Sequence, residues 1–209
     1  MEGLVLTGLA LVLGLSFHQL GYKFSQARLQ RIGVLIFSLL ATLASLVTLR
    51  LQLELGIEYM YNLSLLALLI IASVSDLYSR TIEDLVILAF TSLIVLLRIL
   101  ALRGLGSSLI QACLVFLILY AIYSLSRGSF GGGDVKIFFP LGLVFGLVRS
   151  LEVLFLASLL GLVYIGAGWL IRAIKNRAWP SPSSLRNYQL PFIPFICLAS
   201  LLTYYIQVY

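Results

Sequence analysis

Charged side chains are scarce in this sequence. Asp, Glu, Lys and Arg together make up 11% of the 209 residues, and hydrophobic residues make up 61%. A soluble domain usually has about 25% charged and about 45–50% apolar residues. A water-soluble fold could not bury this much apolar surface. The composition therefore excludes a soluble enzyme and predicts a protein whose solvent is the lipid bilayer.

Side chains that bind metals or form disulfides are also few. There is one histidine, and the two cysteines, Cys113 and Cys197, each lie in an apolar run without forming a CxxC pair. This excludes a zinc ribbon and a disulfide framework, so we interpret both cysteines as small hydrophobic residues. No His, Cys and Glu cluster suits a metal ion, and we expect neither a metal nor another cofactor. A removable signal peptide is not expected, because the first residues lack a basic region and a small-residue cleavage site.

The apolar residues are grouped in runs that are long enough to cross a membrane. A transmembrane helix needs about 20 mostly apolar residues, and only helices or closed barrels satisfy the backbone in lipid. These runs are too long and too uniformly apolar for barrel strands. We therefore predict an all-α, polytopic membrane helical bundle with about eight transmembrane helices. The predicted spans lie near residues 4–20, 32–49, 59–75, 85–101, 108–125, 135–149, 152–171 and 191–208.

The distribution of positive charge predicts the orientation of these spans. With the N-terminus outside, the inside loops hold 10 Lys and Arg residues and the outside segments hold 4. The positive-inside rule then favours a plasma-membrane protein with both termini outside. The net charge of +6 is spread over short loops, so we expect the lipid bilayer and no nucleic acid as a partner.

Two acids are placed where chemistry is expected. Asp76 ends the third predicted span and Asp134 opens the sixth, and the predicted orientation puts both at the cytoplasmic interface. Acids at membrane depth are costly and usually mark a site. Two facing carboxylates can activate water, one accepting a proton while the other polarises a peptide carbonyl. The structural alternatives are that Asp134 caps a helix and that Asp76 pairs with Arg80.

The residues around these acids also have two interpretations each. Gly131, Gly132 and Gly133 precede Asp134, and three glycines allow positive φ and close approach of another backbone, such as that of an extended substrate. Arg80 either keeps Asp76 ionised or binds a substrate carbonyl, or it is a cytoplasmic cation that only fixes the orientation of the helices. Lys136 either steadies the loop of Asp134 or reaches to the interface.

Three runs resemble the signatures of prepilin peptidases, and they occur in the same order. Asp76-Leu77-Tyr78-Ser79-Arg80-Thr81-Ile82 resembles the first signature, and Gly131-Gly132-Gly133-Asp134-Val135-Lys136 resembles the GxGD motif with its following lysine. Leu190-Pro191-Phe192-Ile193-Pro194-Phe195 is similar to the Pro-Phe-x-Pro-Phe run that opens the last helix of the family. The resemblance covers about residues 59–209 and is strongest to archaeal preflagellin and prepilin peptidases.

The resemblance implies a membrane aspartic endopeptidase. Such an enzyme would remove a short basic leader from pilin-like or flagellin-like precursors at the cytoplasmic face, with Asp76 and Asp134 as the catalytic pair. It also implies a six-helix GxGD core at residues 52–209, preceded by a pair of transmembrane helices at residues 1–51 without an assigned role. The loop at about 21–31 is too short for the cysteine-containing insert of many bacterial relatives, so N-methyltransferase activity is not expected.

Two other classes of protein fit parts of the sequence. A small transporter or channel could use Asp76 and Asp134 as a proton or ion relay. Relay acids usually lie near the membrane midplane, and repeated halves would be expected in a transporter, whereas these acids lie at one interface and no repeat is visible. A non-catalytic assembly factor is the third alternative.

Overall fold

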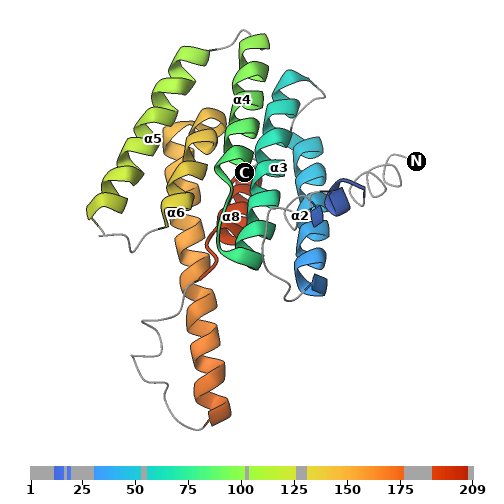
Figure 1. Ribbon diagram of the computed structural model, residues 1–209, viewed down its shortest axis with the longest axis vertical. Coiled ribbons are helices and arrows are strands. Elements are labelled where there is room, and N and C mark those ends of the chain that lie inside the picture. Colours follow the sequence, from blue (N-terminus) through green and yellow to red (C-terminus); the bar gives the residue numbers. More distant parts are fainter. Residues whose placement is uncertain are drawn as a thin grey trace.

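Every regular element in the described part of the chain is a helix. The computed structural model describes residues 12–16, 18–19, 31–52, 56–101, 104–125, 131–176 and 190–206, and these contain helices and no strand (Figure 1). The all-α prediction is therefore confirmed. The principal helices are α2 (Arg31–Gln52), α3 (Ile57–Ser79), α4 (Asp84–Leu100), α5 (Leu105–Leu125), α6 (Gly132–Asn176) and α8 (Ile193–Ile206).

The predicted spans correspond to helices wherever the structure describes them, but the predicted count of eight is not confirmed. Four described segments are long and apolar enough to cross a membrane: Gly33–Arg50, Ile57–Ser79, Leu105–Leu125 and Gly132–Ile171. Two further apolar helices, α4 and α8, have 17 and 14 residues. The predicted span at 4–20 and the polar stretch at 172–190 lie mostly outside the described residues, and so does the loop at 21–31.

Helix α3 is the centre of the bundle. It packs against α2, α4, α6 and α8, and the side chains from Leu65 to Val74 are almost all buried. The outer faces of the other helices remain apolar, as shown by Leu88 on α4, Leu117 on α5 and Leu162 on α6, which are 67%, 58% and 66% exposed. An apolar core inside an apolar exterior is the arrangement expected of a bundle surrounded by lipid.

Close packing joins α5 to α6. A Cβ atom added at Gly142 would lie 2.8 Å from the Cα atom of Ala112, so the two backbones are too close for any larger residue at this point. Lipid chains are as apolar as leucine, and helices in a membrane therefore associate through van der Waals contact at small residues. The glycine thus permits the contact between these two helices.

Helix α6 is broken at Gly146. A straight helix of 45 residues would be about 68 Å long, more than twice the ~30 Å of a bilayer core. Gly146 has φ 79° and ψ −177°, a conformation available almost only to glycine, and the chain reverses there (Figure 1). The sequence predicted this turn around Arg149 and Glu152. The break lies earlier because glycine, not charge, permits the required backbone conformation.

Polar side chains from neighbouring helices satisfy the backbone groups that the break exposes. Gln111 Oε1 on α5 accepts a hydrogen bond of 3.0 Å from the Leu147 N–H. Arg98 on α4 donates to the carbonyl oxygen of Val144 at 3.2 Å and also to the Ser108 hydroxyl. In an apolar medium an unsatisfied backbone group costs several kcal/mol. These side chains therefore stabilise the reversal in the middle of a long apolar segment.

Replacing Gly146 with alanine is expected to destabilise the bundle by about 1–3 kcal/mol. The new Cβ would need a glycine-only backbone conformation and would collide with Gln111 Oε1. Thermal unfolding in detergent should show the loss. Gly166→Ala is the control, because nothing lies within 4 Å of a Cβ at that helical position. Equal melting temperatures for the two variants would contradict this account of the break.

Candidate active site

Asp76 lies in the last turn of α3. The helix ends because Arg80 takes the left-handed conformation (φ 55°, ψ 27°) and donates its backbone N–H to the carbonyl oxygen of Asp76 at 3.0 Å. The Ser75 hydroxyl donates to the carbonyl of Thr81 at 2.8 Å and fixes the departing chain. Asp76 itself is only 7% exposed. A short polar side chain is thus held inside the bundle at one end of its central helix.

The N-terminus of α8 contacts the carboxylate of Asp76. The backbone N–H of Ile193, the first residue of α8, donates to Asp76 Oδ2 at 3.2 Å, and the backbone of Phe192 also hydrogen-bonds to this carboxylate. The next residue, Pro194, has no N–H to satisfy. The first amides of a helix lack partners within the helix and favour negative charge. The third motif of the sequence therefore supplies the donors that hold Asp76.

Asp134 lies in the first turn of α6, and its side chain packs against the backbone of Gly131. Its backbone N–H donates to the carbonyl of Gly131 at 3.1 Å, and its side chain folds back over the same residue. A Cβ at Gly131 would lie 2.5 Å from Asp134 Oδ2 and 3.2 Å from its Cγ. At Gly132 a Cβ would meet only Tyr123, at 3.8 Å. Of these two glycines, Gly131 is the one whose missing side chain leaves room for the carboxylate.

The structure brings the two acids to one end of the bundle. The carboxylate of Asp76 acts electrostatically on that of Asp134. The segment that follows Asp76 and the one that precedes Asp134 also touch, since Ile82 Cδ1 lies 3.2 Å from the position of a Cβ at Gly133. Two motifs that are far apart in the sequence thus form one site between α3, α6 and the start of α8.

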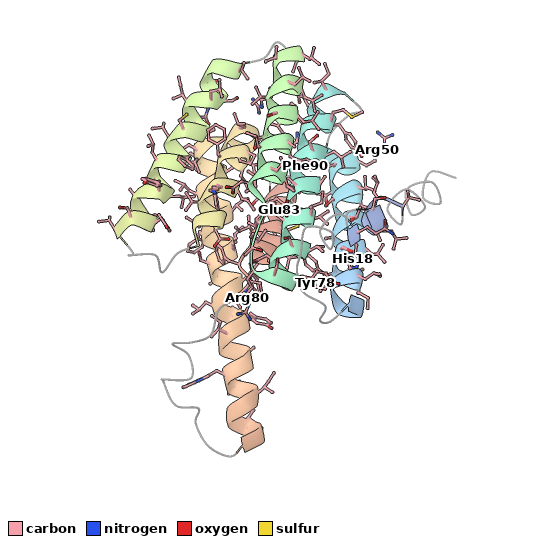
Figure 2. All side chains as sticks on the ribbon, in the orientation of Figure 1. His18, Arg50, Tyr78, Arg80, Glu83 and Phe90 are labelled. Atoms are coloured by element: carbon pink, nitrogen blue, oxygen red, sulfur yellow. The ribbon has the colours of Figure 1, made fainter. Side chains whose placement is uncertain are left out.

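The two predicted supporting cations have different positions. Lys136 does not steady Asp134 directly; its Nζ atom pairs with Asp84 at 2.6 and 2.8 Å and so connects the first turns of α6 and α4. Arg80 acts electrostatically on Asp76 from the end of α3, the lower end of the bundle in Figure 2. The sequence indicated Asp84 as an acid in the first turn of a helix, which the structure confirms, but not its ion pair with Lys136.

The arrangement suits proton transfer to and from a bound water. One carboxylate accepts hydrogen bonds from backbone amides, while a second lies within its electrostatic field, which favours a single proton shared between them. Among the described residues, no three His, Cys, Asp or Glu side chains gather as metal ligands would. The groups present can therefore act as a general base and a general acid.

Comparisons with known proteins agree with the motifs. The model of a family described as the type IV leader peptidase family matches residues 63–166, a range that contains both acids. A relative from Bacillus subtilis (strain 168), named prepilin leader peptidase/N-methyltransferase, is 29% identical over 192 residues. This alignment covers 88% of the present chain and 73% of the relative. No solved structure matches the chain significantly.

Proposed function

Because this chain belongs to the type IV leader peptidase family, we propose that it is a membrane aspartic endopeptidase that cleaves the short basic leader from prepilin-like or preflagellin-like precursors. Asp76 and Asp134 are the catalytic pair of this proposal. Gly131 leaves room for the carboxylate of Asp134 and Gly133 leaves room for Ile82, and Arg80 and Lys136 support the site. The cleavage takes place at the cytoplasmic face of the plasma membrane.

One observation carries the proposal: the segments that follow and precede the two motif acids touch at one end of the bundle, where Ile82 Cδ1 lies 3.2 Å from the position of a Cβ at Gly133. A pair of carboxylates that shares one proton can hydrolyse a peptide bond without a covalent intermediate. The ionised acid takes a proton from water, whose oxygen attacks the carbonyl carbon, and the protonated acid gives its proton to the carbonyl oxygen. When the resulting diol collapses, the departing nitrogen takes the first proton, and the second returns to its acid.

The test is cleavage by the purified protein. The full chain in detergent is incubated with a prepilin-like precursor, and the product is identified by mass. A variant with both Asp76 and Asp134 changed to asparagine is the negative control. Release of the leader by the wild type and not by the control supports the proposal. Equal processing by the two proteins would refute the assignment of these acids.

The orientation in the membrane is also part of the proposal. Both termini lie outside, as the 10-to-4 distribution of cations favours. In a cysteine-free background, single cysteines at Ser79, Ser129 and Ser183 are expected to react with an impermeant thiol reagent only from the inside. A cysteine at Ser107, at the opposite end of α5 from the GxGD motif, should react only from the outside. Labelling of any of these positions from the other side would invalidate the orientation.

We further expect no methyl transfer. The loop at about 21–31 is short and lacks cysteine, whereas the name of the Bacillus relative includes an N-methyltransferase. With S-adenosylmethionine present, the cleaved product should keep an unmodified N-terminal amine. Mass spectrometry decides between the two outcomes, because one added methyl group would show that the chain has the second activity.

A further inference from the structure

The two acids of the site have different surroundings. The carboxylate of Asp76 accepts hydrogen bonds from the first amides of α8, including that of Ile193 at 3.2 Å, and Arg80 lies within its electrostatic range. Hydrogen bonds to a carboxylate favour its ionised form, and so do a helix N-terminus and a nearby cation. These three influences act in the same direction and oppose the burial of the carboxylate, which favours its protonated form.

Asp134 also lies in the first turn of a helix, α6, but among the described contacts neither an amide hydrogen bond nor a cation is found at its carboxylate. The cation of its own motif, Lys136, is bound to both carboxylate oxygens of Asp84. Its charged neighbour is Asp76, and the repulsion between two carboxylates favours a proton on one of them. The side chain of Asp134 rests over Gly131 rather than on a set of amide donors. If one proton is shared, these surroundings place it on Asp134.

From this asymmetry we infer that the N-terminus of α8 assigns the catalytic roles: it holds Asp76 as the ionised general base and leaves Asp134 as the protonated general acid. The inference rests on the proposed peptidase function and deepens it. Asp76 then accepts the proton from the attacking water, and Asp134 donates its proton to the carbonyl oxygen of the scissile bond. The amide of Ile193 is a positioning group, because it acts through Asp76 without touching the substrate.

A proline at position 193 tests the role of this amide. Proline lacks the N–H and is tolerated in the first turn of a helix, so Ile193→Pro removes the hydrogen bond to Asp76 and keeps α8. Ile193→Ala is the matched control, since it also removes the buried side chain but retains the N–H. A second variant replaces the amide N–H of residue 193 by an ester oxygen and keeps the isoleucine side chain. This variant separates the hydrogen bond from any misfolding caused by proline.

The dependence of cleavage on pH is the first measurement. In a bell-shaped profile the acidic limb reports ionisation of the base, and the basic limb reports loss of the proton from the acid. We expect the acidic limb of the proline and ester variants to move to higher pH by about one unit relative to the alanine and wild-type proteins, and the basic limb to stay. Movement of the basic limb alone would reverse the roles, and movement of neither limb would show that the amide has no role.

An infrared titration of the carboxyl groups reads the same ionisations without cleavage. The pair should lose its two protons in two steps, and only the lower step should move to higher pH in the proline and ester variants. This measurement separates the proposed peptidase function from the assignment of roles to the two acids. If the wild type cleaves no precursor, the proposed function fails, while the titration still reports which step depends on the amide. An unchanged lower step refutes the role assignment even if cleavage is observed.

Discussion

Changing either Asp76 or Asp134 to asparagine is expected to reduce cleavage to below about one thousandth of the wild-type rate. Each acid has its own task in the proposed mechanism, and general acid–base catalysis by a positioned group contributes about 10²–10⁴-fold. Asparagine keeps the shape of the side chain and, at position 76, keeps an oxygen that can accept the hydrogen bond from Ile193. Both variants should therefore accumulate in the membrane at normal levels. Initial rates on a precursor and thermal unfolding in detergent measure the two effects.

Asp84 provides the matched control for these substitutions. It lies at the same end of the bundle and is paired with Lys136, but its side chain is 73% exposed. An exposed ion pair contributes about 0–1 kcal/mol, so Asp84→Asn should lower the rate no more than about fivefold. If Asp84→Asn were as damaging as Asp76→Asn, any acid at this end of the bundle would be equivalent, and the assignment of the pair would be wrong.

Alanine at Gly131 is expected to lower the rate about a hundredfold while the bundle stays folded. The new methyl group would occupy a position 2.5 Å from Asp134 Oδ2, so the carboxylate has to move away from its present place. A displacement of about 1 Å in a catalytic group costs on the order of 10²-fold. The residue has no positive φ, so the effect arises from the contact and not from backbone strain.

Gly132→Ala serves as the comparison for Gly131→Ala. A methyl group there meets only Tyr123 at an ordinary contact distance of 3.8 Å, and the rate should remain within about twofold of the wild type. Gly133→Ala is expected to lie between the two, because its methyl group meets the flexible end of Ile82 at 3.2 Å. Equal losses at Gly131 and Gly132 would show instead that the flexibility of the three glycines matters more than the space they leave.

The helical architecture was predictable because it depends on local patterns. Runs of apolar residues determine where helices form in lipid, and α2, α3, α4 and α5 occupy the positions that such runs predict. A boundary inside α6 was predicted between the spans 135–149 and 152–171, whereas the break lies a few residues earlier, at Gly146. The break depends on a backbone conformation and on Gln111 of another helix, and neither can be read from hydropathy.

The candidate site was predictable only in part. The sequence indicated both acids and the glycines before Asp134, because polar residues and glycine runs are conspicuous among apolar spans. It did not indicate that α8 would donate to Asp76, a contact across 117 residues. Nor did it indicate that Lys136 would pair with Asp84 across 52 residues. Such pairings depend on how the helices pack, which the spacing of residues along the chain does not encode.

The reversal at Gly146 makes the number of membrane crossings between Asp134 and the start of α8 even. In the proposed orientation, α6 leaves the side of the site at Gly132, turns at Gly146 and returns, and α8 then starts beside Asp76. An even number of crossings is required for the amide of Ile193 to reach that carboxylate. Loss of one of the two segments of α6, before or after Gly146, would carry Ile193 to the opposite face of the membrane. The two segments can therefore be gained or lost during evolution only as a pair.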